Sequence, residues 1–321
     1  MVSATPATPA SCALVGCGVV GTVLGLRLLR AGHPLIVHDR LRSRASTLLD
    51  AGARWADAPG DAARAGEVVI TALPGAAEVI DVSRSDRGIW SGATKDTLWL
   101  QTSTVGPACA RLLARDASGR GLTMLDAPVS AGAPRDAAPS LTIWVGGHVD
   151  HFDRARPLLD VLADRVIYCG GAGHAQVVKL VNAAVTHTLT AALGEALCLG
   201  VAGGVDLDVL RTALHHGTAQ NRVLDELLPS SVFRGNFEAG LRLELAARDL
   251  ELAEGLAVEA GLEPSLIRRT IERFAEARGR GWAEASAHAV IRLNEEEAGV
   301  SLRSAAMVDL AANQGDDDST P

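Results

Sequence analysis

The sequence predicts an α/β N-terminal domain with a predominantly parallel sheet, plus an all-α C-terminal domain joined to it by a long interdomain helix. Two observations lead to this prediction. Over the first half of the chain, short apolar runs alternate with helical stretches, which is the pattern of βαβ units and a parallel sheet. From about Gly173 onward, helical periodicity dominates and strand patterns disappear. A length of 321 residues also favours two domains.

The individual elements follow from these periodicities. The long helix should end at Gly203 and Gly204, because glycine is a common helix stop. The expected strands are Cys12–Gly16, Leu35–Asp39, Glu67–Leu73, Thr97–Thr102, Leu122–Pro128, Leu141–Gly146 and Arg165–Tyr168. The expected helices are Val19–Ala31, Arg42–Ala51, about Gly173–Ala202, Asp206–His215 and Leu241–Ala260.

The two ends of the chain are expected to lie outside the folded domains. The first residues carry no positive charge and no long apolar stretch, which argues against a signal peptide, and the acidic end is typical of a solvated tail. The predicted divisions are a disordered leader at 1–10, the α/β domain at 11–171, the helical domain at 172–312 with the interdomain helix at 172–203, and an acidic disordered tail at 313–321.

Composition excludes several classes of protein. The apolar fraction of 48% is enough for a large core, and the net charge of −8 shows no basic footprint for nucleic acid. The five cysteines are odd in number and form no CxxC pair, so free thiols in a reducing cytoplasm fit best. The apolar run Val181–Val201 contains His187 and Glu195, and we interpret it as a buried helix of a soluble protein rather than a membrane span.

A glycine-rich segment follows the first expected strand and opens the first expected helix. In a dinucleotide-binding Rossmann domain, the first glycine allows a tight turn, the second lets the backbone approach a pyrophosphate, and the third permits close helix–strand packing. The exposed N–H groups at the helix start then receive the phosphate charge. The segment consists of Gly16, Cys17, Gly18, Val19, Val20 and Gly21.

An acid at the end of the second strand supports this interpretation. Asp39 lies 18 residues after Gly21, where a carboxylate can accept hydrogen bonds from the adenosine ribose hydroxyls. Arg40, with Arg42 and Arg44 behind it, offers an alternative, because arginine can hold the extra phosphate of NADP. We favour NAD as cofactor, since Asp39 would repel that phosphate, and NADP is the alternative.

Two further segments carry groups suited to a substrate. Ser130, Ala131 and Gly132 form a small-residue turn after the fifth expected strand, where a hydroxyl and backbone N–H groups could grip a carboxylate. Lys179 and Asn182 lie three residues apart on one face of the long helix, in apolar surroundings. A lysine there is costly unless it is exposed or functional, and it could act as base toward an alcohol and as acid toward a carbonyl.

These motifs together resemble the β-hydroxyacid dehydrogenase family, which includes 3-hydroxyisobutyrate dehydrogenase. The resemblance covers about Ser11 to Val300. The corresponding segments are the GxGxxG turn at Gly16 to Gly21, the "LP" turn at Leu73 and Pro74, the "DxST…P" stretch at Gln101 to Pro107, the "DAPVSGG" loop at Asp126 to Gly132, the "KxxNN" helix at Lys179 to Ala183, and the "KDLxLA" segment at Arg248 to Ala253.

The resemblance implies specific functions for these residues. It implies an NAD(P)-dependent oxidoreductase that transfers hydride reversibly between the cofactor and a small β-hydroxy acid or its semialdehyde or keto form. Lys179 would be the catalytic acid and base, and Asn182 would orient the substrate or the lysine. The other implied residues are Ser130, Ala131, Gly132, Ser103 and Asp249 for the substrate, and Leu73, Pro74, Thr104 and Arg248 for the cofactor side. Family members commonly pair through the helical domain, so a homodimer or homotetramer is implied.

The sequence departs from the family pattern at several positions, among them Pro134 and Arg135 in the loop after Gly132. Gln101 replaces the usual acid, Ala131 the first glycine of the pair, Ala183 the second asparagine, and Arg248 the usual lysine, with a changed donor geometry. The catalytic residues Lys179 and Asn182 are therefore retained while the substrate pocket is altered, and we expect a substrate other than 3-hydroxyisobutyrate itself.

Two alternative functions are weighed against this one. An imine reductase or reductive aminase on the same scaffold usually carries Asp or Tyr where Lys179 stands, and a non-catalytic dehydrogenase-like binding protein usually lacks the lysine. Both are therefore disfavoured. No metal site is predicted, because the histidines show no zinc-ligand spacing.

Overall fold

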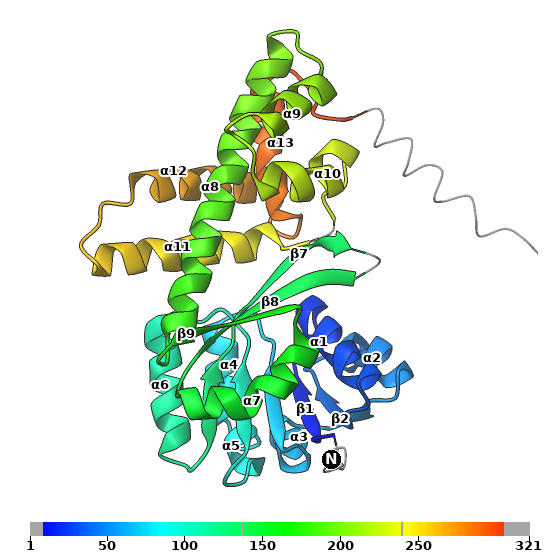
Figure 1. Ribbon diagram of the computed structural model, residues 1–321, viewed down its shortest axis with the longest axis vertical. Coiled ribbons are helices and arrows are strands. Elements are labelled where there is room, and N and C mark those ends of the chain that lie inside the picture. The colour runs from blue at the N-terminus through cyan, green and yellow to red at the C-terminus, as the bar shows by residue number, and fades with distance from the viewer. Residues whose placement is uncertain (1–8, 136–137, 239, 305–321) are drawn as a thin grey trace, which may run out of the picture. The chain divides into compact units, whose positions relative to one another are not determined.

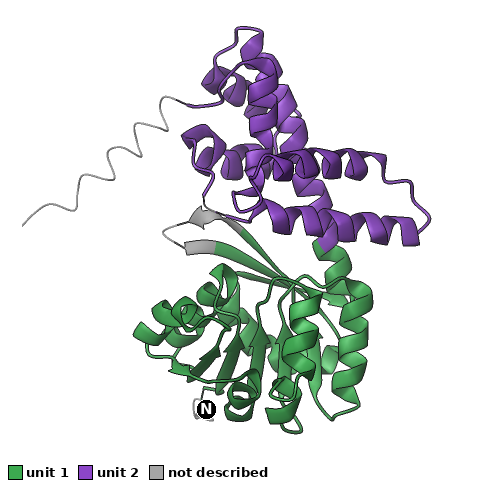
Figure 2. Ribbon diagram, turned by 180° about the vertical axis from the view of Figure 1, so that it is seen from behind, with its two compact units in different colours: residues 1–131, 140–179 green, residues 132–139, 180–321 purple. Residues whose placement is uncertain are grey.

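The computed structural model describes residues 9–135, 138–238 and 240–304 (Figure 1). The chain divides into two compact units, the first made of residues 1–131 and 140–179 and the second of residues 132–139 and 180–321 (Figure 2). Of the predicted leader, only residues 9 and 10 are described, and they form neither helix nor strand. The predicted tail at 313–321 lies outside the described residues.

Unit 1 is built on a sheet whose strands follow the apolar runs of the sequence. The strand order is β3-β2-β1-β4-β5-β6-β8-β7, with β9 paired to β8. The pairs from β3 through β6 are parallel, as is β8 with β9, whereas β6 and β8 are antiparallel. The strands are β1 (Cys12–Val15), β2 (Leu35–His38), β3 (Arg54–Trp55), β4 (Val68–Thr71), β5 (Leu98–Gln101), β6 (Thr123–Asp126), β7 (Val129–Arg135), β8 (Ala138–Gly146) and β9 (Arg165–Gly170).

The structure corrects the prediction at β7. Ser130, Ala131 and Gly132 were expected to form a turn, but they lie inside the strand Val129–Arg135. The segment is short of large apolar residues, so it lacks the run or the alternation that marks a strand. The two-residue strand β3 was also missed, because it is too short to show a period.

Helices cover both faces of this sheet, since successive strand residues point to opposite sides. Leu14 and Leu100 pack with α1 and α7 on one side, whereas Ala13 and Trp99 pack with α3 to α6 on the other. The helical elements are α1 (Val19–Arg30), η1 (Arg42–Ala45), α2 (Ser46–Asp50), α3 (Pro59–Ala65), α4 (Ala76–Arg84), α5 (Ile89–Gly92), α6 (Pro107–Ser118) and α7 (Val149–Leu162). The α/β domain with a predominantly parallel sheet that the sequence predicts is confirmed.

The long helix α8 (His174–Ala202) begins in unit 1 and continues into unit 2. Its length and apolar composition would also allow it to cross a membrane, and 33% of its most apolar window is buried within the protein. The core helix of a soluble protein has the same properties, and two of its residues, Leu193 and Leu197, belong to the core of unit 2.

Beyond residue 180, the regular elements of unit 2 are helices in the part of the chain that the structure describes, apart from one isolated bridge between Arg242 and Ser286. Phe233 and Phe274 are among its largest buried side chains. The predicted helices at 206–215 and 241–260 are confirmed to within two residues at each end. Beyond α8, the elements are α9 (Leu207–His216), η2 (Val223–Leu227), α10 (Leu228–Ser230), η3 (Val232–Arg234), α11 (Leu243–Glu259), α12 (Ser265–Gly279), η4 (Ala287–Val290) and α13 (Ile291–Ala298).

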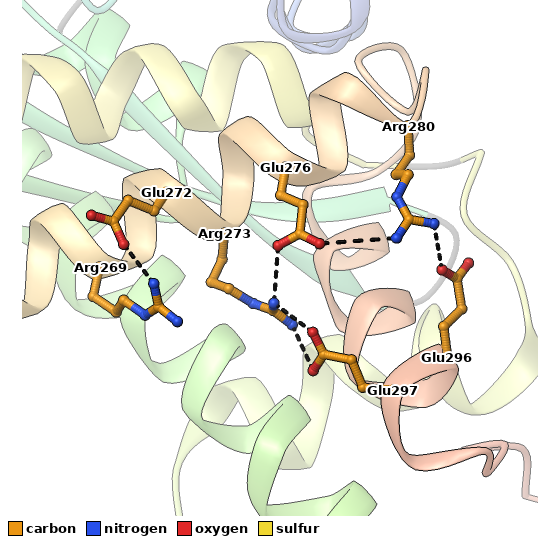
Figure 3. Close-up of polar contacts among 7 residues, drawn as sticks. All are labelled: Arg269, Glu272, Arg273, Glu276, Arg280, Glu296 and Glu297. Carbon is orange, nitrogen blue, oxygen red and sulfur yellow. Dashed lines mark hydrogen bonds and ion pairs between the residues drawn. The ribbon is translucent and has the colours of Figure 1, made fainter.

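Charged side chains connect α12 to α13 within unit 2 (Figure 3). Arg273 has a side chain that is only 12% exposed, and its guanidinium binds both carboxylate oxygens of Glu297 at 2.7 and 3.1 Å. It also contacts Glu276 at 3.0 Å. A bidentate pair of this kind contributes more to stability than an exposed single contact.

Candidate active site

The glycine turn between β1 and α1 has the geometry that a dinucleotide requires. Gly16 adopts φ +100°, and a Cβ there would lie 2.3 Å from the carbonyl oxygen of Ala72. A Cβ on Gly21 would lie 1.9 Å from the carbonyl oxygen of Gly16. Both positions therefore exclude any side chain, as the functions assigned to the first and third glycines demand.

The second glycine leaves the turn open to a ligand. A Cβ on Gly18 would meet nothing within 4 Å, and the following residue, Val19, is 79% exposed. No side chain caps α1 within the described part of the chain. The helix start therefore presents N–H groups and a partial positive charge, to which the pyrophosphate of a dinucleotide can bind.

Asp39 is linked to this turn by its carboxylate. It is only 8% exposed, and its Oδ2 accepts a hydrogen bond of 2.8 Å from the Cys17 N–H, while Oδ1 accepts one of 2.9 Å from the Leu41 N–H. The Cys17 N–H is thus used within the protein, which leaves Gly18 and the residues after it to bind phosphate. Burial, and then the Asp39 charge, raise the pKa of the Cys17 thiol to about 12, so this thiol stays protonated at neutral pH.

The arginines after Asp39 differ in their surroundings. Arg40 is exposed, and among the described residues it has no carboxylate within ion-pair distance. The guanidinium of Arg42 lies over the Trp55 ring, 5.2 Å from its centroid. Arg40 is therefore accessible to a ligand, whereas Arg42 is held on an aromatic ring.

Two loops at the carboxyl edge of the sheet are joined through Ser103. Its Oγ accepts a hydrogen bond of 2.8 Å from the N–H of Leu73, which precedes Pro74 in the loop after β4. Ser103 is 4% exposed, while its neighbour Thr104 is half-buried. The hydroxyl of Ser103 thus fixes the Leu73–Pro74 loop to the loop after β5.

Sequence reasoning missed Gln176, although it lies three residues before Lys179. Its side chain is completely buried. The amide oxygen accepts hydrogen bonds from the N–H groups of Val105 (3.0 Å) and Gly106 (3.2 Å), and the amide nitrogen donates to the Ser103 carbonyl (3.1 Å). The only signal in the sequence is a polar residue on an apolar helix, one turn before the lysine.

Asp126 was predicted only as the start of a motif, with no function of its own. It is 2% exposed, and Oδ1 accepts a hydrogen bond of 3.0 Å from the Gly173 N–H, just before α8. Oδ2 has no hydrogen-bond partner among the described residues. Burial raises the pKa of this carboxyl, against the opposing effect of its backbone hydrogen bonds.

The predicted catalytic residues lie on α8. Lys179 is half-buried near the start of the helix, and Asn182 is half-buried one turn later. Ala183, which stands on α8 where the family has a second asparagine, is 3% exposed. Lys179 and Asn182 therefore share a helix face, as their spacing predicts.

The other predicted substrate residues lie on β7 and α11. Ser130 is half-buried and Ala131 is exposed, with Gly132 following in the same strand. On α11, Arg248 is exposed and Asp249 is 7% exposed. Within unit 1 the structure thus brings together the glycine turn with Asp39, and the Leu73–Pro74 loop with Ser103.

Family models match both halves of the chain. Residues 11–171 match the NAD-binding domain of 6-phosphogluconate dehydrogenase, and residues 173–294 match the NAD-binding domain of NADP-dependent 3-hydroxyisobutyrate dehydrogenase. An NAD-dependent L-serine dehydrogenase of Pseudomonas aeruginosa is 34% identical over 76% of this chain and 84% of its own. A 3-hydroxyisobutyrate dehydrogenase of the same species is 32% identical over 81% and 90% of the two chains.

Solved structures agree with these matches. Mycobacterium tuberculosis 3-hydroxyisobutyrate dehydrogenase with L-serine has a TM-score of 0.79 and 28% identity, over 89% of this chain and 99% of its own. Psf3 in complex with NADP+ and 2-OPP has a TM-score of 0.81 and 25% identity, over 88% and 99%. An imine reductase of Streptomyces aurantiacus has a TM-score of 0.58 at 23% identity, over 88% and 99%, which shows a shared fold alone.

The chain belongs to the β-hydroxyacid dehydrogenase family. It is an NAD(P)-dependent oxidoreductase, and the open glycine turn with its buried acid fits the dinucleotide that the family binds.

Proposed function

We propose that this enzyme transfers hydride reversibly between NAD and a small β-hydroxy acid or its semialdehyde, with Lys179 as general acid and base. One observation carries the proposal. The helix that bears Lys179 is fixed at its start to the carboxyl edge of the nucleotide-binding sheet, through Asp126 bound to Gly173 and through the buried amide of Gln176. Ligands of α/β sheets bind outside this edge.

Lysine is also an unusual choice in this chain. Of 30 basic residues only Lys95 and Lys179 are lysines, and the rest are arginines. Arginine stays protonated in proteins, whereas an amine can release and regain a proton. A lysine kept on an apolar helix of an arginine-rich protein therefore supports a function in proton transfer.

The proposed chemistry divides between cofactor and protein. The nicotinamide supplies the hydride chemistry. Gly18 and the start of α1 would hold the pyrophosphate of the dinucleotide, and Asp39 would hold its adenosine ribose. In oxidation the Lys179 amine accepts the proton of the substrate hydroxyl, and in reduction the Lys179 ammonium polarises the carbonyl oxygen and protonates it.

The substrate class follows from the predicted carboxylate site and from the names of the relatives. L-serine and 3-hydroxyisobutyrate both carry a primary alcohol on the carbon next to the one that bears the carboxylate. Ser130, Ala131 and Gly132 would hold that carboxylate, and Asn182 would orient the alcohol. Asp249, Thr104 and Arg248 would complete the surroundings of the substrate and nicotinamide. Because the family pattern is altered at Ala131 and Arg248, we place the substrate within this class but distinct from 3-hydroxyisobutyrate.

We further propose NAD over NADP, a cytoplasmic location, and assembly into a homodimer or homotetramer through the helical domain. The Asp39 carboxylate supports the first, and the free thiols of all five cysteines support the second. Exposed apolar residues of α8, with Val181 and Val185 each 55% exposed and Leu199 76% exposed, support the third.

Lys179→Ala and Lys179→Arg test the catalytic assignment. Both should keep cofactor binding and lose most turnover of L-serine and 3-hydroxyisobutyrate, because general acid–base catalysis contributes about 10²- to 10⁴-fold. Lys95→Ala, at an exposed position before β5, is the matched control and should keep the wild-type rate. Near-native turnover in either Lys179 variant would show that the lysine is not the acid and base.

A further inference from the structure

The amide of Gln176 is placed to control where Lys179 lies. Gln176 is in the first turn of α8, and its side chain has no exposed surface. It is three residues before Lys179, so the two side chains project from adjacent turns of a rigid helix. Any shift of the first turn is therefore passed directly to the lysine.

The three hydrogen bonds that this amide makes with described residues all reach one short loop. Its oxygen accepts from the N–H groups of Val105 and Gly106, and its nitrogen donates to the carbonyl of Ser103. These backbone groups lie in the loop between β5 and α6. A buried backbone N–H left without an acceptor costs about 1–3 kcal/mol, so the loop and the helix start are strongly held in one register.

The same loop is fixed on its other side. The Ser103 hydroxyl accepts from the N–H of Leu73 in the loop after β4, and Gly106 adopts φ +80° at the start of α6. The contacts run from the β4 loop through Ser103 to Gln176 and along one helical turn to Lys179. Asp126 holds the Gly173 N–H as a second anchor of the helix start.

We propose that Gln176 is the positioning residue for Lys179, and that its amide sets the distance between the lysine and the loops at the carboxyl edge of the sheet. The proposal rests on the function proposed above for Lys179. Only glutamine satisfies the geometry fully. Methionine offers neither acceptor nor donor, glutamate keeps the acceptor but loses the donor, and asparagine is one methylene too short.

Three variants test the proposal. Gln176→Met removes all three hydrogen bonds, and Gln176→Glu keeps the two from Val105 and Gly106 but loses the one to Ser103. Thr190→Val is the matched control, because Thr190 is also a fully buried polar residue of α8, and its one hydrogen bond to a described residue goes to Thr186 in its own helix. Circular dichroism and the unfolding midpoint establish that each variant is folded.

Two readouts need no turnover. Hydrogen exchange at the Val105 and Gly106 amides should accelerate in Gln176→Met, much less in Gln176→Glu, and not in Thr190→Val. The acylation rate of Lys179, which mass spectrometry separates from that of Lys95, should change in Gln176→Met while that of Lys95 stays constant. Unchanged exchange and unchanged acylation in Gln176→Met would overturn the proposal.

A double-mutant cycle tests whether the hydrogen bonds of Gln176 affect the reaction through Lys179. With L-serine or 3-hydroxyisobutyrate as probe, Gln176→Met should lower kcat about 10- to 100-fold, the effect of displacing a reacting group by about 1 Å. A deuterium isotope effect on kcat should rise, because hydride transfer becomes the slower step; a loss of active enzyme would leave that effect unchanged. In a Lys179→Ala background the same substitution should have little further effect.

The outcomes separate the two proposals. If the fold-losses in kcat of the two single substitutions multiply in the double variant, Gln176 does not act through Lys179 and the positioning proposal fails. If Lys179→Ala keeps the wild-type rate, the proposed function fails instead, whatever the exchange and acylation measurements show for Gln176.

Discussion

Asp39→Asn tests the assignment of the cofactor site. Asparagine has nearly the shape of aspartate but only one acceptor oxygen, while the native carboxylate accepts hydrogen bonds from both Cys17 and Leu41. One of these two backbone N–H groups would lose its acceptor. We expect a loss of stability of about 1–3 kcal/mol, the usual cost of a buried unsatisfied donor.

The same substitution should change the choice between NADH and NADPH. At about 5 Å and an effective dielectric constant of about 20, each pair of unit charges repels by about 3 kcal/mol. Solvent near the exposed Arg40 weakens this repulsion, and about 1.4 kcal/mol corresponds to a tenfold change in Kd. Removing the Asp39 charge should therefore shift the ratio of the two dissociation constants toward NADPH by about 10- to 100-fold.

Fluorescence titration with NADH and NADPH measures both constants. Asp57→Asn is the matched control, because it makes the same change of charge at an exposed position of the same unit, where the carboxylate accepts a hydrogen bond from Trp55. The control should leave the ratio unchanged. If the wild type binds NADPH more tightly, or if both variants shift the ratio equally, Asp39 does not contact the ribose and the reasoning is wrong.

Two further predictions concern stability. Because burial raises the pKa of Asp126 in the folded state, the native carboxyl keeps its proton at a pH where the unfolded chain has lost it, and stability falls as pH rises above about 4. Asp126→Asn has no such proton, so its unfolding midpoint should rise relative to the wild type from pH 4 toward neutrality; a constant difference would contradict the assignment. In unit 2, Arg273→Met should lower the free energy of unfolding by about 1–3 kcal/mol, because it breaks the bidentate contact with Glu297 (Figure 3). The exposed Arg269→Met should change it much less in denaturant titrations, and equal losses would show that burial and bidentate geometry make no difference.

The fold could be predicted where the physical cause is local. The turn from β1 to α1 is such a case, because its glycines answer to backbone angles and contacts within a short segment, and Gly16 and Gly21 both prove unable to carry a side chain. The strand β7 could not be predicted in the same way. Its residues are mostly small, and they form a strand because of pairing with β8 rather than because of their own pattern.

The hydrogen bonds that hold the start of α8 could not be predicted from the sequence for a related reason. Asp126 and Gly173 are 47 residues apart, and Gln176 is 73 residues from Ser103. No periodicity links such positions, and each residue alone has an ordinary interpretation as a core polar group. Lys179 could be found because a lysine on an apolar helix conflicts with its surroundings, whereas a neutral glutamine that hydrogen-bonds through both amide atoms does not.

The departure at Gln101 has a physical consequence at the same edge of the sheet. Gln101 pairs in register with Asp126 across the parallel strands β5 and β6, so the two side chains project from the same face. Gln101 is fully buried, and within the described chain neither its amide nor the second oxygen of Asp126 has a hydrogen-bond partner. An acid at this position, as in the family pattern, would place two buried carboxyls side by side, and they could not both ionise. Glutamine leaves Asp126 as the one carboxyl of this pair, beside the start of the helix that carries Lys179. The substitution therefore removes one titratable group from the edge of the sheet that holds the start of this helix, while the backbone pairing of β5 with β6 is kept.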